Sequence, residues 1–185
     1  MSSPLEFRLT LYPDPVLRKV AAPVPAFDEG LRATVEAMFE LMYRSNGVGL
    51  AAPQVGLNQR ILVLNPSGER EQKDQELALV NVTILDRSGA PSTYEEGCLS
   101  FPQIYAEVRR PERCKVRAFT PDGTPLEREF DGFTSRVIQH EYDHLEGVLL
   151  VDRMSLADKQ RHKAALEELV ERYKRSRARA GASRP

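Results

Sequence analysis

His140, Glu141 and His144 form a pattern that could bind a metal ion and use it. Residues 140–144 read His-Glu-Tyr-Asp-His, and on a helix the two histidines project from one face. Two imidazoles placed in this way can hold one metal ion at about 2.0–2.1 Å from each nitrogen. Glu141 follows the first histidine, where its carboxylate can take a proton from a metal-bound water without being a ligand. The pattern therefore indicates hydrolysis at a metal centre.

A surface helix that carries two histidines by chance is the alternative, because HExxH is a short motif with false positives. The chain contains only three histidines, and two of them fall in this motif. The neighbouring Val137, Ile138 and Leu145 are apolar, which indicates a buried helix rather than a solvated one. Both observations favour the metal site.

A catalytic site of this type needs a third protein ligand, and Cys98 is the best candidate. Cys98 follows Gly97 in the middle of the chain, and a thiolate is a strong ligand for a borderline-soft divalent metal. Cys114 alternates with apolar residues, which is typical of a small core residue. His162 lies among charged residues and is expected to be solvated. The residues alone leave open a second role for Cys98, as a nucleophile activated by a histidine.

Helices at both ends of the chain and strands in its middle are expected to position these residues. The HExxH helix should run from about Phe133 to Leu145. Other helices are expected after Asp14, from about Glu29 to Arg44 and from about Ser155. Strands are expected at 60–65, 77–85, 105–109, 114–120 and 126–130. Without a βα alternation, this order predicts an α+β fold, with a mainly antiparallel sheet packed around the central HExxH helix and a C-terminal helix.

Length and composition restrict the class of protein. With 185 residues, 41% hydrophobic and 29% charged, the chain is expected to form one globular domain. No run of 18 apolar residues is present, so no membrane span is expected. The net charge of −1 argues against a molecule built as a whole to bind nucleic acid or anionic lipid. The first residues lack an export signal and there are two cysteines, so a cytoplasmic location is expected.

The end of the chain has a different charge from the rest. From residue 172 to 185 there are six Lys or Arg residues and no Asp or Glu. We therefore expect a catalytic domain at 1–171, which includes the C-terminal helix, and a basic, flexible tail at 172–185. A solvated tail and a tail that contacts a polyanion are both consistent with this composition.

Three stretches resemble the sequence motifs of the peptide deformylase family. Residues 47–54 read Gly-Val-Gly-Leu-Ala-Ala-Pro-Gln, residues 96–100 read Glu-Gly-Cys-Leu-Ser, and residues 139–144 read Gln-His-Glu-Tyr-Asp-His. In order and rough spacing they resemble the family's GxGLAAxQ, EGCLS and QHExDH motifs. HExxH alone is shared with many metalloproteases, whereas three motifs in this order are highly specific. The similarity covers nearly the whole chain.

The resemblance implies an enzyme that hydrolyses one particular amide bond. Family members remove the N-terminal formyl group from the formyl-methionine of nascent polypeptides and release formate. The matching positions imply that Cys98, His140 and His144 are the metal ligands. They also imply that a metal-bound water is the nucleophile and that Glu141 is the general acid/base.

The same motifs imply how the substrate is held. Gln54, through its side-chain amide, and Leu99, through its backbone N–H, would donate hydrogen bonds to the developing oxyanion, and one such donor is typically worth about 2.7–4 kcal/mol of barrier. The peptide is expected to lie alongside the protein backbone as an added strand. The residues expected to contact it are Val48, Gly49, Gly97 and Val137, with Phe101 or Tyr105 as further candidates for the methionine pocket.

The resemblance also implies a metal and a partner. A Cys/His/His set would bind zinc well, but the family implies Fe²⁺ in the cell, with Zn²⁺, Ni²⁺ or Co²⁺ as substitutes. Family members act on emerging chains, and a basic C-terminal extension is known in the family to dock on the ribosome. RNA phosphates would then be contacted by Lys174, Arg175, Arg177 and Arg179.

Two other functions fit the HExxH motif. An HExxH endoprotease would cleave internal peptide bonds, but it has no need for EGCLS. A non-catalytic metal-binding module would want a fourth protein ligand, and the sequence offers none.

Overall fold

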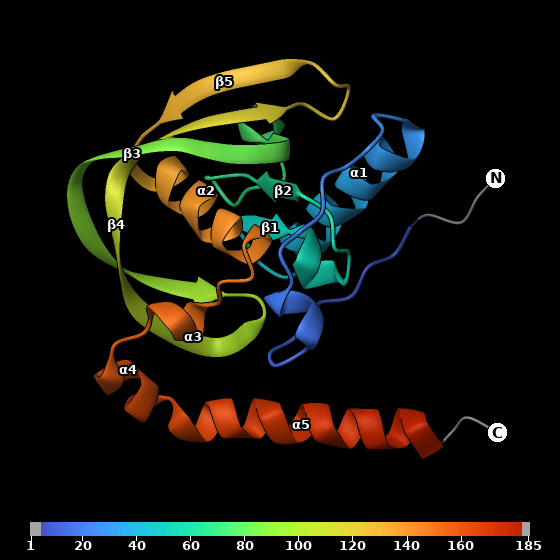
Figure 1. Cartoon of the computed structure of the whole chain (residues 1–185), viewed down its shortest axis with the longest axis vertical. Coiled ribbons are helices and arrows are strands. Elements are labelled where there is room, and N and C mark those ends of the chain that lie inside the picture. The colour runs from blue at the N-terminus through green and yellow to red at the C-terminus, as the bar shows by residue number, and fades with distance from the viewer. Residues whose placement is uncertain (1–4, 183–185) are drawn as a thin grey trace.

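A five-stranded antiparallel sheet in the order β1-β2-β3-β4-β5 forms the centre of the protein (Figure 1). The computed structural model describes residues 5–182, with side chains through residue 179. The strands are β1 (Gly49–Ala51), β2 (Ile61–Leu64), β3 (Leu77–Cys98), β4 (Phe101–Phe119) and β5 (Pro125–Phe130). The α-helices are α1 (Glu29–Arg44), α2 (Gly132–Leu145), α3 (Leu150–Arg153), α4 (Leu156–Arg161) and α5 (Lys163–Ala182). Short 3₁₀ turns lie at η1 (Pro15–Arg18), η2 (Ala52–Val55) and η3 (Lys73–Gln75).

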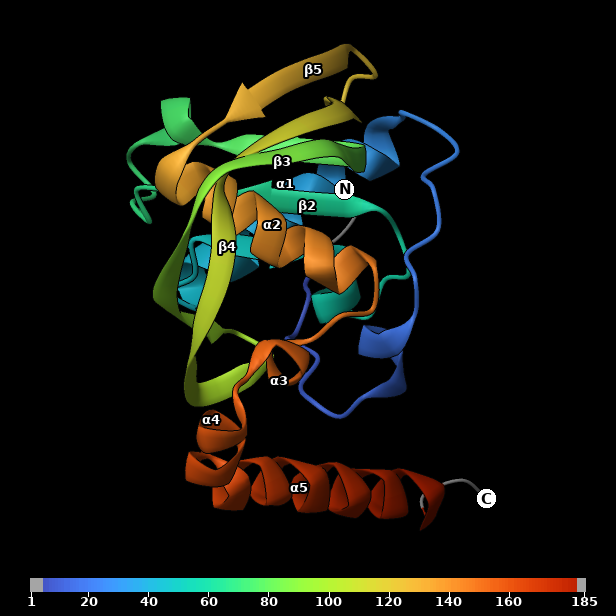
Figure 2. The ribbon, with the colours of Figure 1, turned by 60° about the vertical axis from the view of Figure 1, so that its left-hand side comes forward.

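Strand β2 is buried on both faces, which explains its unbroken apolar sequence. Alternate side chains of a strand point to opposite faces. Leu62 and Leu64 pack in one cluster with α2, whereas Ile61 and Val63 pack in a second cluster with α1. The sheet therefore separates the two helices, and α2 lies inside the curve that β3 and β4 make (Figures 1 and 2). These features confirm the expected α+β fold around a central HExxH helix.

Strands β3 and β4 form one long, bent hairpin, where the sequence pattern predicted three shorter strands. Pro91 pairs with Pro111 in the middle of the hairpin, and the register shifts between Ser88 and Pro91. A proline cannot donate a backbone hydrogen bond, and both prolines lie outside the expected strands at 77–85, 105–109 and 114–120. Because the two prolines lie opposite each other beside a shift in the strand register, the hairpin bends there without ending. The bend carries Cys98, at the end of β3, toward α2.

Local sequence signals define the ends of the two main helices. The Asp28 carboxylate accepts a hydrogen bond from the Leu31 N–H at 3.0 Å and caps α1 as expected. Helix α2 ends before Gly147, whose φ is +69°. A β-carbon on Gly147 would lie 2.5 Å from the carbonyl oxygen of Arg18, so no larger residue fits there. This glycine lets the chain turn sharply at the end of the HExxH helix.

The C-terminal helix expected from Ser155 is present in two segments. Ser155 caps α4 by accepting a hydrogen bond from the Asp158 N–H at 3.0 Å. The helix is interrupted at His162 and continues as α5. Leu156 is 85% exposed, and Leu169 is the buried residue that packs with Phe101.

Helix α5 continues through the segment that was expected to be a flexible tail. Residues 172–182 are helical, and ion pairs such as Lys174–Glu171, at 2.8 Å, link successive turns. In both views α5 lies along the edge of the molecule, apart from the sheet (Figures 1 and 2). The expected boundary at residue 171 therefore does not coincide with the end of an element. The last part of the expected tail, residues 183–185, lies outside the described residues.

Among the described residues, no helix combines the length and the hydropathy that crossing a membrane requires.

Candidate active site

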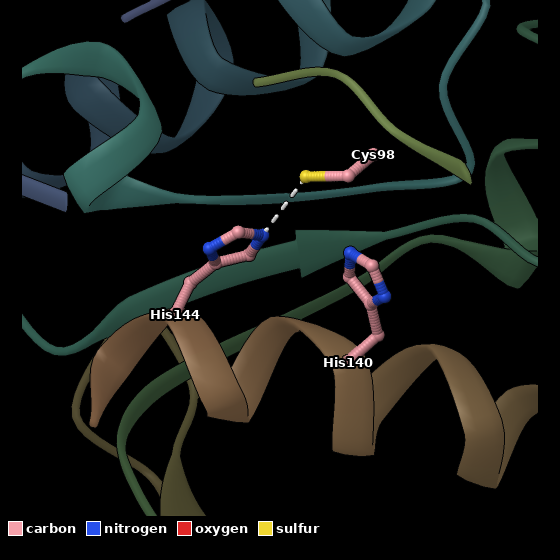
Figure 3. Close-up of side chains that lie close together, drawn as sticks. All are labelled: Cys98, His140 and His144. Atoms are coloured by element: carbon pink, nitrogen blue, oxygen red, sulfur yellow. Dashed lines mark hydrogen bonds between the residues drawn. The ribbon is translucent and has the colours of Figure 1, made fainter. Parts of the chain in front are cut away.

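Cys98, His140 and His144 come together on one side of α2 (Figure 3). Their candidate ligand atoms all lie within 4.8 Å of one another, and Cys98 Sγ is 3.3 Å from His144 Nε2. The two histidines come from successive turns of α2, and the cysteine from the end of β3. One thiolate and two imidazoles within this distance fit a single divalent metal ion and leave a coordination position for water or substrate.

His140 is oriented by a buried carboxylate behind it. Its Nδ1 donates a hydrogen bond to Glu96 Oε2 at 2.9 Å, so Nε2 remains for a metal. Glu96 also accepts hydrogen bonds from Arg110 at 2.7 and 2.9 Å and from Arg136 at 2.8 Å. Burial raises the pKa of Glu96, but the hydrogen bonds from His140 and Arg110 outweigh it and lower the pKa to about 2. Glu96 is therefore ionised at neutral pH.

Glu141 is buried beside the ligands and has a free oxygen. The residue is 4% exposed, and its Oε2 has no hydrogen-bond partner among the described residues. Burial raises the pKa of Glu141 to about 7, although the charges of His140 and Arg110 act in the opposite direction. A β-carbon on Gly49 would lie 2.6 Å from Glu141 Oε1, so the bare backbone of β1 is what gives the carboxylate room. An unpartnered carboxyl group of this pKa can both take and return a proton.

The side chain of Gln54 is held so that its amide group faces the ligands. Its Oε1 accepts a hydrogen bond from the Ala51 N–H at 2.8 Å. Its Nε2 lies 3.3 Å from Ser100 Oγ and 3.6 Å from Cys98 Sγ. The carbonyl end thus binds the backbone of β1, and the NH₂ group donates toward Ser100 and the Cys98 thiol, so it faces the candidate ligands. Gln54 is 1% exposed and has little freedom to turn.

A pocket of about 720 Å³ opens beside these groups. It is lined by all four residues expected to contact substrate, which are Val48, Gly49, Gly97 and Val137. Gln54, Leu99 and Glu141 also line it, as do both further candidates, Phe101 and Tyr105. His144 does not line the pocket and is 1% exposed. The structure therefore brings every predicted site residue to one place, with His144 at its buried side.

Two other candidates lie elsewhere, as expected. Cys114 is fully buried in the core with Val116, and burial raises the pKa of its thiol. His162 lies at the end of α4 and does not belong to the ligand cluster. Neither residue belongs to the candidate metal site.

Sequence reasoning missed a set of buried charges behind the ligands. Arg110 bonds to both Glu96 and Asp143, the latter at 2.9 Å, and Arg153 bonds to Asp143 from the other side at 2.6 Å. Glu96 and Asp143 were visible as motif residues, but nothing in the sequence indicated their arginine partners. Arg110 lies 14 residues along the chain from Glu96 and Arg153 lies at the end of α3, and only the fold brings them to these carboxylates.

Comparisons with known proteins identify the family of this chain. The family model described as polypeptide deformylase matches residues 7–160. A peptide deformylase of Thermotoga maritima is 43% identical over 169 residues, which cover 91% of this chain and 99% of that protein. The chloroplastic peptide deformylase 1B of rice is 41% identical, and the match covers 91% of this chain but 62% of the rice protein.

Solved structures give the same result. The crystal structure of a variant of Arabidopsis thaliana peptide deformylase 1B has a TM-score of 0.88 and 43% identity, covering 91% of this chain and 92% of that one. The peptide deformylase of Plasmodium falciparum also has a TM-score of 0.88, with 38% identity over 90% of this chain and 97% of that one. The chain thus belongs to the polypeptide deformylase family of metal-dependent hydrolases, which remove the N-terminal formyl group from nascent polypeptides.

Proposed function

We propose that Cys98, His140 and His144 hold one divalent metal ion at which this chain hydrolyses the formyl amide of formyl-methionine. The observation that carries the proposal is the position of the free Glu141 carboxylate, which lines the same pocket as Cys98 and His140. A divalent metal bound to these three residues supplies Lewis-acid activation of water and of the formyl carbonyl.

Glu141 moves the proton that the reaction requires. It takes a proton from the attacking water, whose oxygen bonds to the formyl carbon, and returns it to the nitrogen as the C–N bond breaks. The products are formate and the free amine of the methionine. A bound cation nearby would lower the pKa of Glu141 from about 7, which favours the ionised form that accepts the proton first.

Gln54 and Leu99 stabilise the negative charge that develops on the formyl oxygen. The NH₂ group of Gln54 is oriented by Ala51 and lies near Cys98, and Leu99 follows Cys98 in the turn between β3 and β4. An amide donor is suited to this role because it does not titrate. Removal of one such donor typically costs about 10²–10³-fold in kcat.

The substrate peptide lies between two stretches of bare backbone. Gly49 in β1 and Gly97 in β3 both line the pocket, so an extended peptide can approach main-chain groups on either side. Val48 and Val137 provide apolar wall for the unbranched methionine side chain, and Phe101 and Tyr105 are further candidates.

The metal in the cell is Fe²⁺, with Zn²⁺, Ni²⁺ or Co²⁺ as possible replacements, and the enzyme works in the cytoplasm. The support for Fe²⁺ is the resemblance of the three motifs to the family, since a Cys/His/His set by itself suits zinc as well. A ferrous ion beside the Cys98 thiolate would make the site sensitive to oxidation.

The deciding experiment measures formate release by anaerobically purified protein, with metal analysis of the same sample. We expect release from formyl-Met-Ala and none from acetyl-Met-Ala. Glu141→Ala should retain the metal and lose nearly all activity, because only the proton transfer is removed. Full activity of Glu141→Ala would contradict the mechanism, and cleavage inside a longer peptide would favour an endoprotease instead.

A second proposal concerns residues 172–185, which we propose contact the ribosome. Lys174, Arg175, Arg177 and Arg179 supply positive charge for RNA phosphates. Deletion of residues 172–185 should reduce co-sedimentation with ribosomes at low salt and leave formate release from a dipeptide unchanged. Unchanged co-sedimentation would remove the support for this role, and with it the reason to treat 172–185 as a part separate from the domain at 1–171.

A further inference from the structure

Arg136 is a buried cation that neither the family motifs nor the proposed mechanism uses. It lies on α2 one turn before His140, its side chain is 9% exposed, and it lines the substrate pocket. A buried guanidinium must have its charge and its donors compensated. The hydrogen-bond partners of Arg136 therefore indicate its role.

One nitrogen of Arg136 contacts the carboxylate that orients a proposed metal ligand. Nη1 donates to Glu96 Oε1 at 2.8 Å and lies 3.0 Å from the carbonyl oxygen of Val108. The other oxygen of Glu96 accepts the hydrogen bond from His140 Nδ1 at 2.9 Å. Arg110 binds the same carboxylate in a fork, through 2.7 and 2.9 Å bonds. Two arginines thus fix the plane of the carboxylate that His140 faces.

The other nitrogen contacts β3 two residues before Tyr94, which lines the substrate pocket. Nη2 donates to the carbonyl oxygen and the hydroxyl of Ser92, at 2.8 and 2.9 Å, in the half of β3 that leads to Cys98. The guanidinium also lies under the ring of Tyr94, 5.6 Å from its centroid. Tyr94 lines the pocket and is 57% exposed, and its ring meets Phe133 edge-on at 6.5 Å. This aromatic wall is therefore supported from beneath by Arg136.

We propose that Arg136 is a positioning residue for deformylation, which holds Glu96 toward His140 with one nitrogen, binds Ser92 of β3 with the other, and supports the Tyr94 ring with the face of its guanidinium. The proposal rests on the proposed role of His140 as a metal ligand. The planar guanidinium of Arg136 can contact Glu96 and β3 at the same time, whereas a lysine ammonium can reach only one of them. The arginine thereby links metal retention to binding of the substrate.

The test compares Arg136→Met with a matched arginine outside the site. Arg60 also joins a strand carbonyl to a carboxylate at the end of α2, through bonds of 2.9 Å to Val82 and 2.7 Å to Glu146, and its side chain is 13% exposed. Arg60→Met should lower thermal stability but change the rate of metal release to a chelator less than about twofold. Arg136→Met should speed metal release about 10- to 100-fold, the range typical for loss of a group that supports a metal ligand.

Two further measurements separate positioning from general stabilisation. Arg136→Met should raise KM for formyl-Met-Ala as well as lower kcat, because the Tyr94 wall loses its support. In protein that already carries Glu96→Gln, Arg136→Met should add little to metal release, because its effect passes through Glu96. Arg136→Lys keeps the charge, so it should retain metal better than Arg136→Met does. Its KM should recover toward the wild-type value to a smaller extent.

Equal metal release from Arg136→Met and Arg60→Met would overturn the proposal, as would an undiminished effect in the Glu96→Gln protein. If Arg136→Met does not fold, Arg136→Lys decides, and wild-type values of both metal release and KM would reject the role. A wild-type protein that neither retains metal nor releases formate would instead reject the proposed function itself.

Discussion

Two side chains of the candidate site are oriented by a bond on the side away from the pocket. His140 is turned by Glu96 and Gln54 by the backbone of Ala51, so both present the opposite end to the pocket. Glu141 differs, because its Oε2 has no partner among the residues that the structure describes and its burial raises the pKa to about 7. In the proposed mechanism, the side chains that bind metal or substrate are fixed, and the carboxylate that exchanges a proton is left free.

The ionisation of Glu96 should be visible in the pH dependence of stability. Its pKa falls from 4.5 to about 2 in the folded chain, so its contribution is fully present above pH 4.5 and is lost as the pH falls through about 2. A shift of this size corresponds to about 3 kcal/mol. Glu96→Gln should therefore flatten the fall in the free energy of unfolding between these pH values, measured by denaturant titration of metal-free protein. An unchanged slope would mean that Glu96 is not strongly stabilised as the anion.

At the scale of elements, the site is a meeting of three segments that are distant in the chain. Strand β1 supplies bare backbone at Gly49, the end of β3 supplies Cys98, and α2 supplies both histidines and Glu141. The three-residue strand β1 was not predicted, because Gly-Leu-Ala is too short to show a strand pattern. It matters nonetheless, since its distance from α2 determines the space around Glu141.

Gly49→Ala tests this close approach. The added β-carbon would lie 2.6 Å from Glu141 Oε1 and 2.8 Å from Val137 Cγ1, so the carboxylate must move. A displacement of this kind should lower kcat/KM for formyl-Met-Ala about 10- to 100-fold. Metal content should be unchanged, because no ligand contacts the added carbon. Wild-type kinetics would show that Glu141 can shift without consequence.

At the scale of the whole molecule, the catalytic core and the C-terminal helix are joined by few apolar contacts. Leu169 is 6% exposed and packs with Phe101 and Leu149, whereas most of α5 is exposed. The helix is thus attached near its beginning, and the basic residues lie further along it. Such an arrangement lets the end of the helix contact a partner without disturbing the pocket.

Leu169→Ala should lower the free energy of unfolding by about 2 kcal/mol, the lower end of the range for a buried leucine. Leu156→Ala is the matched control, because Leu156 is 85% exposed and its removal should change stability by less than about 0.5 kcal/mol. Denaturant unfolding of both variants gives the comparison. Formate release should be the same in both, and equal stabilities would show that α5 is not anchored through Leu169.

The sequence by itself determined the chemistry of this protein. The spacing of His140 and His144 follows from one turn of a helix, and three motifs in order identified the family before any contact was known. The α+β class also followed, since the order of helical and strand patterns depends on local periodicity. The predicted lengths of the middle strands were wrong, because the strands expected at 77–85, 105–109 and 114–120 are parts of one long hairpin. Only the pairing of Pro91 with Pro111 shows that the hairpin continues through its bend.

Only the tertiary structure decided how the ligands are supported. Arg110 and Arg136 have ordinary surroundings in the sequence, yet both are buried against Glu96. Charged residues are mostly exposed, so sequence patterns give no reason to place these inside. Their partners lie on other elements, and a contact between distant segments exists only once β3, β4 and α2 are packed. The reactive groups were therefore readable from local spacing, whereas the buried charges that orient them were not.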